Sequence, residues 1–309
     1  MKVLHVIPSL APARGGPSTA LPLFERALAA EGVTVETATT DDDGPGRRSP
    51  RPPETVEGGI RRLWFPKQAE FYTRSAPFRR WIGAHVRDYD LVHVHALFSH
   101  VSVSAALAAR RAGVPYVIRP CGALTRYGMA TKPLMKRVSL ALFEARALRG
   151  AAAVQVTSEQ ERDEALELGV PMRPWLLPLG IDDPGAGRAE RFLARHPDAC
   201  GRPRLLFLSR LHPKKNLEAA IDALALLGDG PAAPVLIVCG EGEADYRRAL
   251  AARAAGRGVA GRIVWAGFVT GADKADALAA GDLFVLPSFS ENFGIAAVEA
   301  LFAGLPCVL

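Results

Sequence analysis

The chain has 309 residues, 49% of them hydrophobic and 23% charged, which is typical of a globular protein and too long for one ordinary core. The formal net charge of +6 is compatible with anionic substrates or a membrane surface, but it is too diffuse to indicate nucleic-acid binding. The cysteines lack metal-ligand spacing, and no stretch is long and apolar enough to cross a bilayer, so we expect reduced thiols in a cytoplasmic protein.

The first predicted elements surround a pair of glycines. Residues 2–7 predict a buried strand rather than a secretion signal, because the apolar run is short and prolines interrupt it. A helix is expected from about Pro17, and Gly15 and Gly16 stand between the two elements. Paired glycines at such a turn allow a ligand close to backbone N–H groups, although the spacing of a dinucleotide-binding motif is absent.

Three aspartates follow the second predicted strand, residues 33–39. Asp41, Asp42 and Asp43 open a segment rich in glycine, proline and arginine that extends to about Gly59. Such a run of acids is usually a solvated turn, and we expect a mobile loop here. The alternative is a site for a divalent cation.

Two histidines lie at the end of a later strand. Residues 60–65 and 90–95 are both expected to be strands, and the second reads DLVHVH, with His93 and His95. Taking these histidines to face opposite sides of the strand, we expect at most one of them to face any given cleft. His95 is nearer the carboxyl end, where ligands bind in open α/β sheets, although a lone strand histidine is more often a core residue.

Aromatic residues and cations are mixed in residues 71–87 and in a long helix expected over residues 132–148. The buried side of that helix is expected to comprise Leu134, Val138, Leu142 and Ala145. The mixture suits the edge of an anionic bilayer, and it suits arginine stems lying over a core at least as well. The residues concerned are Phe71, Tyr72, Phe78, Arg79, Arg80, Trp81, Lys132, Lys136 and Arg137.

The first half is expected to close with a strand at residues 175–179. Before it, residues 152–157 predict a strand and residues 158–161 a capping box that starts a helix. Residues 182–203 are rich in proline, glycine and arginine and are predicted to be a linker. The expected domains are therefore residues 1–181 and 204–309.

The second half restarts the alternation of strand and helix. After a strand at residues 204–209, the sequence RLHPKKN places Arg210 and Lys215 in a loop before a helix. Two cations at the end of a strand can balance the charge of a diphosphate, whereas a basic pair in a loop is more often solvated surface. Two further strands end in turns, residues 235–239 at Gly240 and residues 262–266 at Gly267 and Phe268.

Residues 286–304 organise the rest of the chain. A buried strand runs into a polar loop, and a helix begins after Gly294, so that the N–H groups of Phe293, Gly294 and Ile295 are available to an anion. Glu291 precedes this helix and Glu299 lies roughly 7 Å along it. A phosphate between two acceptor groups suits a ligand with hydroxyls at both ends of a diphosphate, which describes a nucleotide sugar.

With Glu291 and Glu299 spaced around Asn-Phe-Gly, this stretch resembles the retaining glycosyltransferases of family 4 (group 1), which share the two-domain GT-B fold. The resemblance covers essentially the whole chain and includes the glycine pair, the His-x-His strand and the Arg-x4-Lys of RLHPKKN. It departs at Pro120-Cys121-Gly122, where Cys121 replaces the more usual arginine.

The resemblance implies an α/β fold with two facing Rossmann-like domains and parallel sheets. It implies transfer of a hexose, with retention, from a nucleotide-sugar donor to a hydroxyl of a glycan or lipid-linked saccharide. Catalytic roles are implied for His95, Arg210, Lys215 and Glu291. Donor-binding roles are implied for Gly15, Gly16, Gly240, Gly267, Phe268, Phe293, Gly294, Ile295 and Glu299.

No metal or other cofactor is expected. Metal-dependent GT-A glycosyltransferases hold a divalent cation with a pair of aspartates, but the other motifs suit the GT-B fold, which needs no metal. The alternatives are a non-hydrolysing nucleotide-sugar epimerase of the same fold and an inert nucleotide-sugar-binding or scaffolding subunit. Members of the family usually continue beyond the point where this chain stops, so we expect a truncated second domain. The expected location is the cytoplasm, with peripheral contact at the inner face of the cytoplasmic membrane as a further hypothesis.

Overall fold

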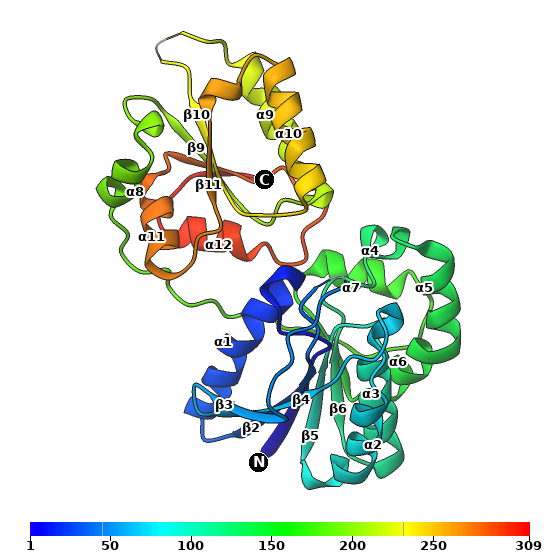
Figure 1. Ribbon diagram of the computed structural model, residues 1–309. Coiled ribbons are helices and arrows are strands. Elements are labelled where there is room, and N and C mark those ends of the chain that lie inside the picture. The colour runs from blue at the N-terminus through cyan, green and yellow to red at the C-terminus, as the bar shows by residue number, and fades with distance from the viewer. Residues whose placement is uncertain (45, 231) are drawn as a thin grey trace. The chain divides into compact units, whose positions relative to one another are not determined.

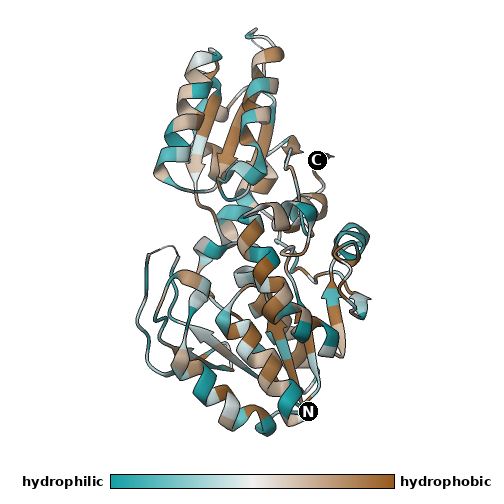
Figure 2. Ribbon diagram, turned by 90° about the vertical axis from the view of Figure 1, so that its right-hand side faces the viewer, coloured by the Kyte–Doolittle hydropathy of each residue, from teal (hydrophilic) through white to brown (hydrophobic). Residues whose placement is uncertain are grey.

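The computed structural model describes residues 1–44, 46–230 and 232–309 (Figure 1). The chain divides into two compact units, Met1–Gly180 and Ile181–Leu309. Each unit is a sheet of mainly parallel strands with helices packed against it. Several strands inside each unit are coloured as hydrophobic, and the helices beside them carry both hydrophobic and hydrophilic positions (Figure 2).

The sheet of the first unit has the strand order β3-β4-β2-β1-β5-β6-β7-β8 and is parallel except for β3. One face is apolar, with Leu4, Val6 and Val94 buried in the main core. The strands are β1 (Lys2–Val6), β2 (Thr34–Thr40), β3 (Glu54–Glu57), β4 (Ile60–Phe65), β5 (Leu91–His95), β6 (Tyr116–Arg119), β7 (Ala153–Val156) and β8 (Pro174–Leu176).

Helices cover both faces of this sheet. The apolar face carries α2 and α3, whose Phe78, Ile82 and Val101 belong to the same core. The other face carries α1, whose Glu25 is fully buried and bonds to Thr37 and Arg62 of the sheet. The helices are α1 (Gly16–Ala30), α2 (Ala76–His85), α3 (His100–Ala112), α4 (Arg126–Ala130), α5 (Pro133–Ser139), α6 (Ala145–Gly150) and α7 (Glu159–Leu166), with short turns η1 (Pro12–Arg14), η2 (Phe71–Thr73), η3 (Val86–Asp88) and η4 (Leu140–Glu144).

The segment expected to be a loop up to about Gly59 contains a strand. β3 pairs antiparallel with β4, with Glu57 opposite Ile60, so Gly58 and Gly59 form a two-residue hairpin turn. Both glycines have positive φ values, 58° and 80°, as such turns require. The sequence signal for this hairpin was the Gly58-Gly59 pair between two short runs of residues that favour strands.

The long helix expected over residues 132–148 is interrupted, and its buried side was assigned wrongly. η4 is a π-helical turn, which rotates the face that follows it. Ser139 and Glu144 point inward and bond to the hydroxyl of Tyr72, and Ala145 is buried as expected. The remaining expected core residues are exposed instead, by 78% at Leu134, 50% at Val138 and 63% at Leu142.

The second unit has the strand order β11-β10-β9-β12-β13, and all its pairings are parallel. Its strands are β9 (Arg204–Leu208), β10 (Val235–Cys239), β11 (Ile263–Gly267), β12 (Leu283–Val285) and β13 (Cys307–Val308). β10 is buried throughout, as expected for a strand covered on both faces. Its helices are α8 (Ala189–Arg195), α9 (Leu217–Leu226), α10 (Ala244–Gly256), α11 (Gly271–Ala280) and α12 (Ile295–Phe302), with short turns η5 (Pro197–Ala199), η6 (Pro213–Lys215) and η7 (Ala260–Arg262).

Residues 182–203, expected to be a linker, include α8 and belong to the second unit. Phe192 is fully buried in that unit's core. A Cβ at Gly187 would lie 1.9 Å from the carbonyl oxygen of Ala275, so only glycine allows this close approach to α11. Ala199 is also buried in this core, Ala189 and Leu193 pack against it, and Arg195 forms an ion pair with Asp273 of α11. Within the described ranges, every helix falls short of the length and apolar character that a bilayer-spanning segment requires.

We therefore expect Phe192→Ala to destabilise the second unit by about 3–5 kcal/mol, because it empties a fully buried aromatic site. Hydrogen exchange measured peptide by peptide would report the loss locally. Leu226→Ala, at a position that is 88% exposed, is the control and should change stability by less than about 0.5 kcal/mol. Equal exchange in the two variants would mean that α8 is a detached linker.

Candidate functional site

The strand orders define one switch point in each unit. In an open parallel sheet, a crevice forms at the carboxyl edge where two adjacent strands lead the chain in opposite directions. In the first unit the switch point lies between β1 and β5, because β1 continues to β2 on its other side. In the second unit it lies between β9 and β12. The predicted catalytic residues all lie at the ends of these four strands or in the loops that follow them.

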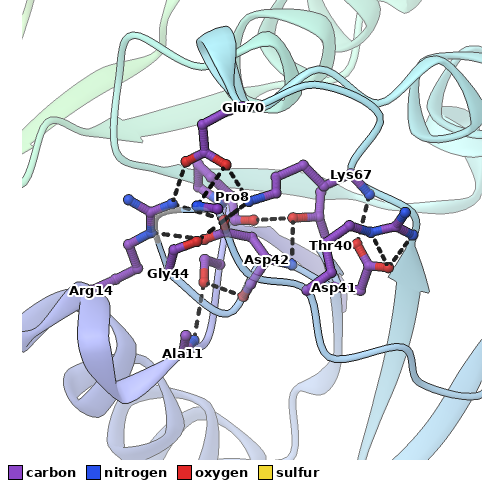
Figure 3. Close-up of polar contacts among 12 residues, drawn as sticks. Pro8, Ala11, Arg14, Thr40, Asp41, Asp42, Gly44, Lys67 and Glu70 are labelled. Carbon is purple, nitrogen blue, oxygen red and sulfur yellow. Dashed lines mark hydrogen bonds and ion pairs between the residues drawn. The ribbon is translucent and has the colours of Figure 1, made fainter.

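The glycine loop after β1 is held in place by ionic contacts from its own arginine (Figure 3). Arg14 donates two hydrogen bonds to the carboxylate of Asp42, at 2.7 and 2.8 Å. The hydroxyl of Ser9 donates to the carbonyl oxygen of Asp42 at 2.8 Å. Gly15 has a φ of 85° and precedes α1, which starts at Gly16 and has no side-chain cap. The loop therefore presents the first turn of α1 without a competing capping group.

The aspartates after β2 are not a solvated turn, and that expectation was wrong for two of them. Asp41 and Asp42 are buried, whereas Asp43 is exposed. Asp42 is also 2.5 Å from the ammonium of Lys67, and Asp41 accepts hydrogen bonds from Arg48 (Figure 3). Burial raises the pKa of Asp42, but hydrogen bonds from Arg14 and Lys67 outweigh it, and the net pKa is lowered. The two buried carboxylates are neutralised by protein cations, which disfavours the divalent-cation alternative.

His93 and His95 face the same side of β5, so the expectation that they face opposite sides was wrong. Val94 lies between them, and alternate residues of a strand point the same way. Their ring centroids are 4.2 Å apart. His5 of β1 completes the cluster, with its Nδ1 atom 2.8 Å from Nε2 of His95. His95 is only 1% exposed, so a ligand would reach it only if the strand-end loop moved.

The histidine cluster is best described as three neutral imidazoles, of which His5 and His95 share a hydrogen bond. The three rings offer nitrogens within 4.8 Å of one another, a spacing that could also hold a metal ion. Arg119 of β6 is paired in register with His95. Its positive charge disfavours a metal cation in the histidine cluster. Burial, with a smaller effect of Arg119, lowers the pKa of His5 to about 3. Burial also lowers the pKa values of His93 and His95, which their histidine neighbours depress further.

The loops that follow β5 and β6 contain non-glycine residues in the left-handed region. The φ values are 67° at Ala96, 55° at Phe98 and 56° at Cys121. Each such residue costs on the order of 1–3 kcal/mol, and such strain concentrates at functional sites. Cys121, where the sequence departs from the family pattern, is half-buried, and burial raises the pKa of its thiol. The thiol is therefore not activated as a nucleophile.

Glu144 is a residue of this region that the sequence did not single out. Its carboxylate is fully buried and accepts hydrogen bonds from the N–H of Phe98 at 2.9 Å and from the hydroxyl of Tyr72. Burial raises its pKa to about 7, although these hydrogen bonds oppose the shift. Glu144 thus fixes one of the strained residues after β5. The signal in the sequence was an acid within an apolar helical run.

In the second unit, one ion pair joins the loops after β9 and β12. The ammonium of Lys215 is 2.5 Å from Oε1 of Glu291, and the hydroxyl of Ser288 donates to the same oxygen at 2.6 Å. The N–H of Phe289 donates to the carbonyl oxygen of Lys214 at 2.9 Å. Arg210 is exposed on the loop after β9. Oppositely charged side chains thus meet at the carboxyl edge, where a charged ligand would bind.

The helix after β12 begins at the predicted glycine. Gly294 has φ 75° and ψ 48° and is the N-cap residue of α12, where a glycine supplies no side-chain cap. Glu299 lies one turn inside α12, and its Oε1 is 2.6 Å from the ammonium of Lys274 on α11. The side chain of Glu299 is 11% exposed. A ligand hydroxyl could bind its other oxygen or replace Lys274.

Two glycines join the carboxyl ends of β10 and β11 to each other and to the start of the loop after β9. A Cβ at Gly240 would lie 1.9 Å from the carbonyl oxygen of Ser209, the residue before Arg210. The N–H of Gly240 donates to the carbonyl oxygen of Gly267 at 2.7 Å. Phe268 follows and is 61% exposed. The structure thus groups the predicted residues of the second unit, whereas Gly15, Gly16 and His95 belong to the first unit.

The chain matches two family models and is similar to several known glycosyltransferases. A family model described as Glycosyl transferase 4-like domain matches residues 15–180, and one described as Glycosyl transferases group 1 matches residues 202–309. The 2-deoxystreptamine glucosyltransferase of Streptomyces kanamyceticus is 30% identical over 238 residues, which cover 74% of this chain and 59% of that protein. The GDP-mannose:cellobiosyl-diphosphopolyprenol alpha-mannosyltransferase of Xanthomonas oryzae is 27% identical, over 100% of this chain and 78% of that protein.

The chain spans 59% of the length of the first two curated relatives that it matches. Among solved structures, Anabaena Alr3699/HepE in complex with UDP and glucose is similar with a TM-score of 0.76 at 21% identity, covering 99% of this chain and 80% of that one. WaaG, a glycosyltransferase involved in lipopolysaccharide biosynthesis, gives a TM-score of 0.71 at 19% identity, covering 99% and 80%. These likenesses confirm the expected GT-B type of α/β fold.

The histidine cluster predicts an acid sensitivity. Since the pKa values of His5, His93 and His95 are lower in the folded chain than the ordinary value of 6.5, the unfolded chain binds more protons below that pH. The first unit should therefore lose stability as pH falls below about 6.5, by about 1.4 kcal/mol per pH unit for each histidine that stays neutral. Urea unfolding at pH 7.5 and pH 5 measures this loss in free energy of unfolding. The loss should be smaller in His93→Gln than in the wild type, whereas the exposed control His85→Gln should match the wild type.

Proposed function

This chain belongs to the group 1 glycosyl transferases, and from that premise we propose that it transfers a hexosyl group from a nucleotide-sugar donor to an acceptor hydroxyl. The observation that carries the proposal is the ion pair of Lys215 with Glu291 at the switch point of the second unit, on the same loop after β9 that carries Arg210. The relatives named above are transferases by name, which favours transfer over epimerisation or an inert binding subunit.

The difficult step in such a transfer is the departure of a diphosphate while positive charge builds on the sugar ring. Arg210 and Lys215 would stabilise the negative charge that develops on the leaving group, together with the N–H groups at the start of α12, from Phe293 to Ile295. The ion pair with Glu291 holds Lys215 in place before the donor binds. Fixed cations need no reorganisation during the reaction, which is what makes them effective.

The remaining residues would position the donor. Glu291 would accept hydrogen bonds from sugar hydroxyls through its second oxygen, and Glu299 from ribose hydroxyls. Gly240, Gly267 and Phe268 would border the base. From the first unit, His95 would contact the sugar, and Gly15 and Gly16 would admit the donor phosphates.

Retention at the anomeric carbon is part of the proposal, and the resemblance to family 4 supports it. We assign no nucleophile. We also propose that the reaction proceeds without a metal ion, because cations of the protein already neutralise Asp41 and Asp42. NMR of the product's anomeric proton would decide the stereochemistry, and incubation of the donor without acceptor would reveal an epimerase.

We expect Arg210→Ala and Lys215→Ala each to lower kcat/KM by on the order of 10²–10³-fold, because each removes a fixed cation from a site of developing charge. Lys214→Ala, in the same turn and with the same charge, is the matched control and should stay within about twofold of the wild type. Turnover is measured with a panel of UDP-, GDP- and ADP-sugars. Wild-type kcat/KM in both site variants would identify the basic pair as ordinary surface.

We further propose that the protein works in the cytoplasm and contacts the inner face of the membrane through the segment α5–η4, using a glycan or lipid-linked acceptor. The exposed apolar stripe of this segment, Leu134, Val138, Leu142 and Phe143, supports the proposal. Residues 71–150 contain thirteen Lys and Arg and three Asp and Glu, so this region is far more basic than the whole chain. An apolar stripe among cations suits an anionic interface.

The protein is therefore expected to co-sediment with phosphatidylglycerol liposomes and not with phosphatidylcholine liposomes. Replacing Leu134 and Leu142 together by Gln should weaken this binding about tenfold or more, since each leucine would lose a favourable burial in the interface. Leu226→Gln, at a leucine of the second unit that is 88% exposed, is the control. Equal, negligible sedimentation with both lipids would end the membrane proposal.

A further inference from the structure

A groove of about 610 Å³ lies in the first unit along α2 and α3. Its floor is apolar, and Val103, Leu107 and Ala108 of α3 contribute to it. Tyr72 of η2 and Phe143 of η4 also line it. Small-molecule sites are typically concave, mostly apolar and of this volume, with a few polar groups that fix the ligand's orientation.

The polar groups of this groove are cationic. Arg79, Arg87 and Arg111 line it, and no acidic residue does. In the described ranges, none of these three guanidinium groups forms an ion pair with a carboxylate. His100 lies at the end where α3 begins, and burial, followed by the charges of Arg79 and Arg74, lowers its pKa. The groove therefore combines an apolar floor with an unneutralised positive potential, which suits an amphiphile with an anionic head.

The groove adjoins two features already described. Phe143 belongs both to the groove and to the exposed apolar stripe of α5–η4, so a membrane that contacts the stripe would reach the groove directly. His100 follows the end of β5 by five residues, at the carboxyl edge of the sheet. From Val103 to Ala112 the floor extends roughly 14 Å along α3. A chain lying on it would run away from the sheet edge that carries His95.

We propose that this groove binds one apolar chain of a membrane lipid phosphate, with the chain along α3 and the phosphate at Arg79 and His100. The lipid comes from the bilayer on which the stripe rests. The site deepens the proposed function in one respect, which rests on that function: a lipid phosphate held here would anchor a lipid-linked acceptor with its saccharide at the carboxyl edge. The binding itself requires neither donor nor transfer.

Isothermal titration with dodecyl phosphate, kept below its micelle-forming concentration, tests the site on the whole chain without nucleotide sugar. We expect saturable binding of one molecule per chain. Ala108→Phe fills the floor and Arg79→Gln removes the phosphate partner, and each should weaken binding about tenfold or more. Arg80→Gln is the matched control, because Arg80 neighbours Arg79 on α2 and does not line the groove. It should bind within about twofold of the wild type.

The outcomes separate the alternatives. Binding that Ala108→Phe and Arg79→Gln leave unchanged, or no binding at all, overturns the proposal. Inorganic phosphate that competes as well as dodecyl phosphate would indicate a simple anion site, and dodecyl maltoside that binds as well would indicate a non-selective apolar surface; either result also overturns it. Thermal unfolding of each variant shows whether it folds. UDP binding, measured separately, tests the second unit, so a failed transferase proposal and a failed groove proposal give different results.

Discussion

The hydrogen-bonded pairing of parallel strands determines where the candidate site residues of this protein lie. Neighbouring strands that run in the same direction end at the same edge, so side chains far apart in the sequence are brought to one place. Lys215 and Glu291 are separated by 76 residues and form an ion pair because β9 and β12 are adjacent and parallel. The pairing of β1 with β5 does the same for His5 and His93, which lie opposite each other in register.

The two faces of the first sheet have different chemistry, and this difference affects what the unit can do. The face under α2 and α3 is apolar, whereas the face under α1 buries histidines, threonines and the Glu25–Arg62 pair. Buried polar groups favour a fold only when they find partners, and several nitrogens of the histidine cluster find none in the described structure. That incomplete pairing lies directly beneath the strained residues after β5. A loop over such a layer can change conformation at a lower cost than one over a close-packed apolar core.

Periodicity and local motifs predicted most of the architecture, and the exceptions have specific physical causes. The strands, the glycine that starts α12 and the basic loop after β9 were readable because each depends on neighbouring residues. The partners of Asp41 and Asp42 were not, because they come from positions 14, 48 and 67. The outward face of α5 was missed because a π-helical turn breaks the regular period. The orientation of His93 and His95 could have been predicted, since counting Val94 places both on one face.

The Arg14–Asp42–Lys67 cluster also restricts how this sequence can vary over evolutionary time. The side chains of Asp42 and Lys67 are only 1% and 4% exposed, so replacing either alone would leave a buried charge without its partner. A later change at the matching position would remove that penalty, so the effects of substitutions at positions 14, 42 and 67 should not add. Homologous chains should therefore keep all three charges or exchange them as a set. Because Arg14 directly precedes the glycine pair, the sequence of the loop after β1 becomes tied to two distant positions, 42 and 67.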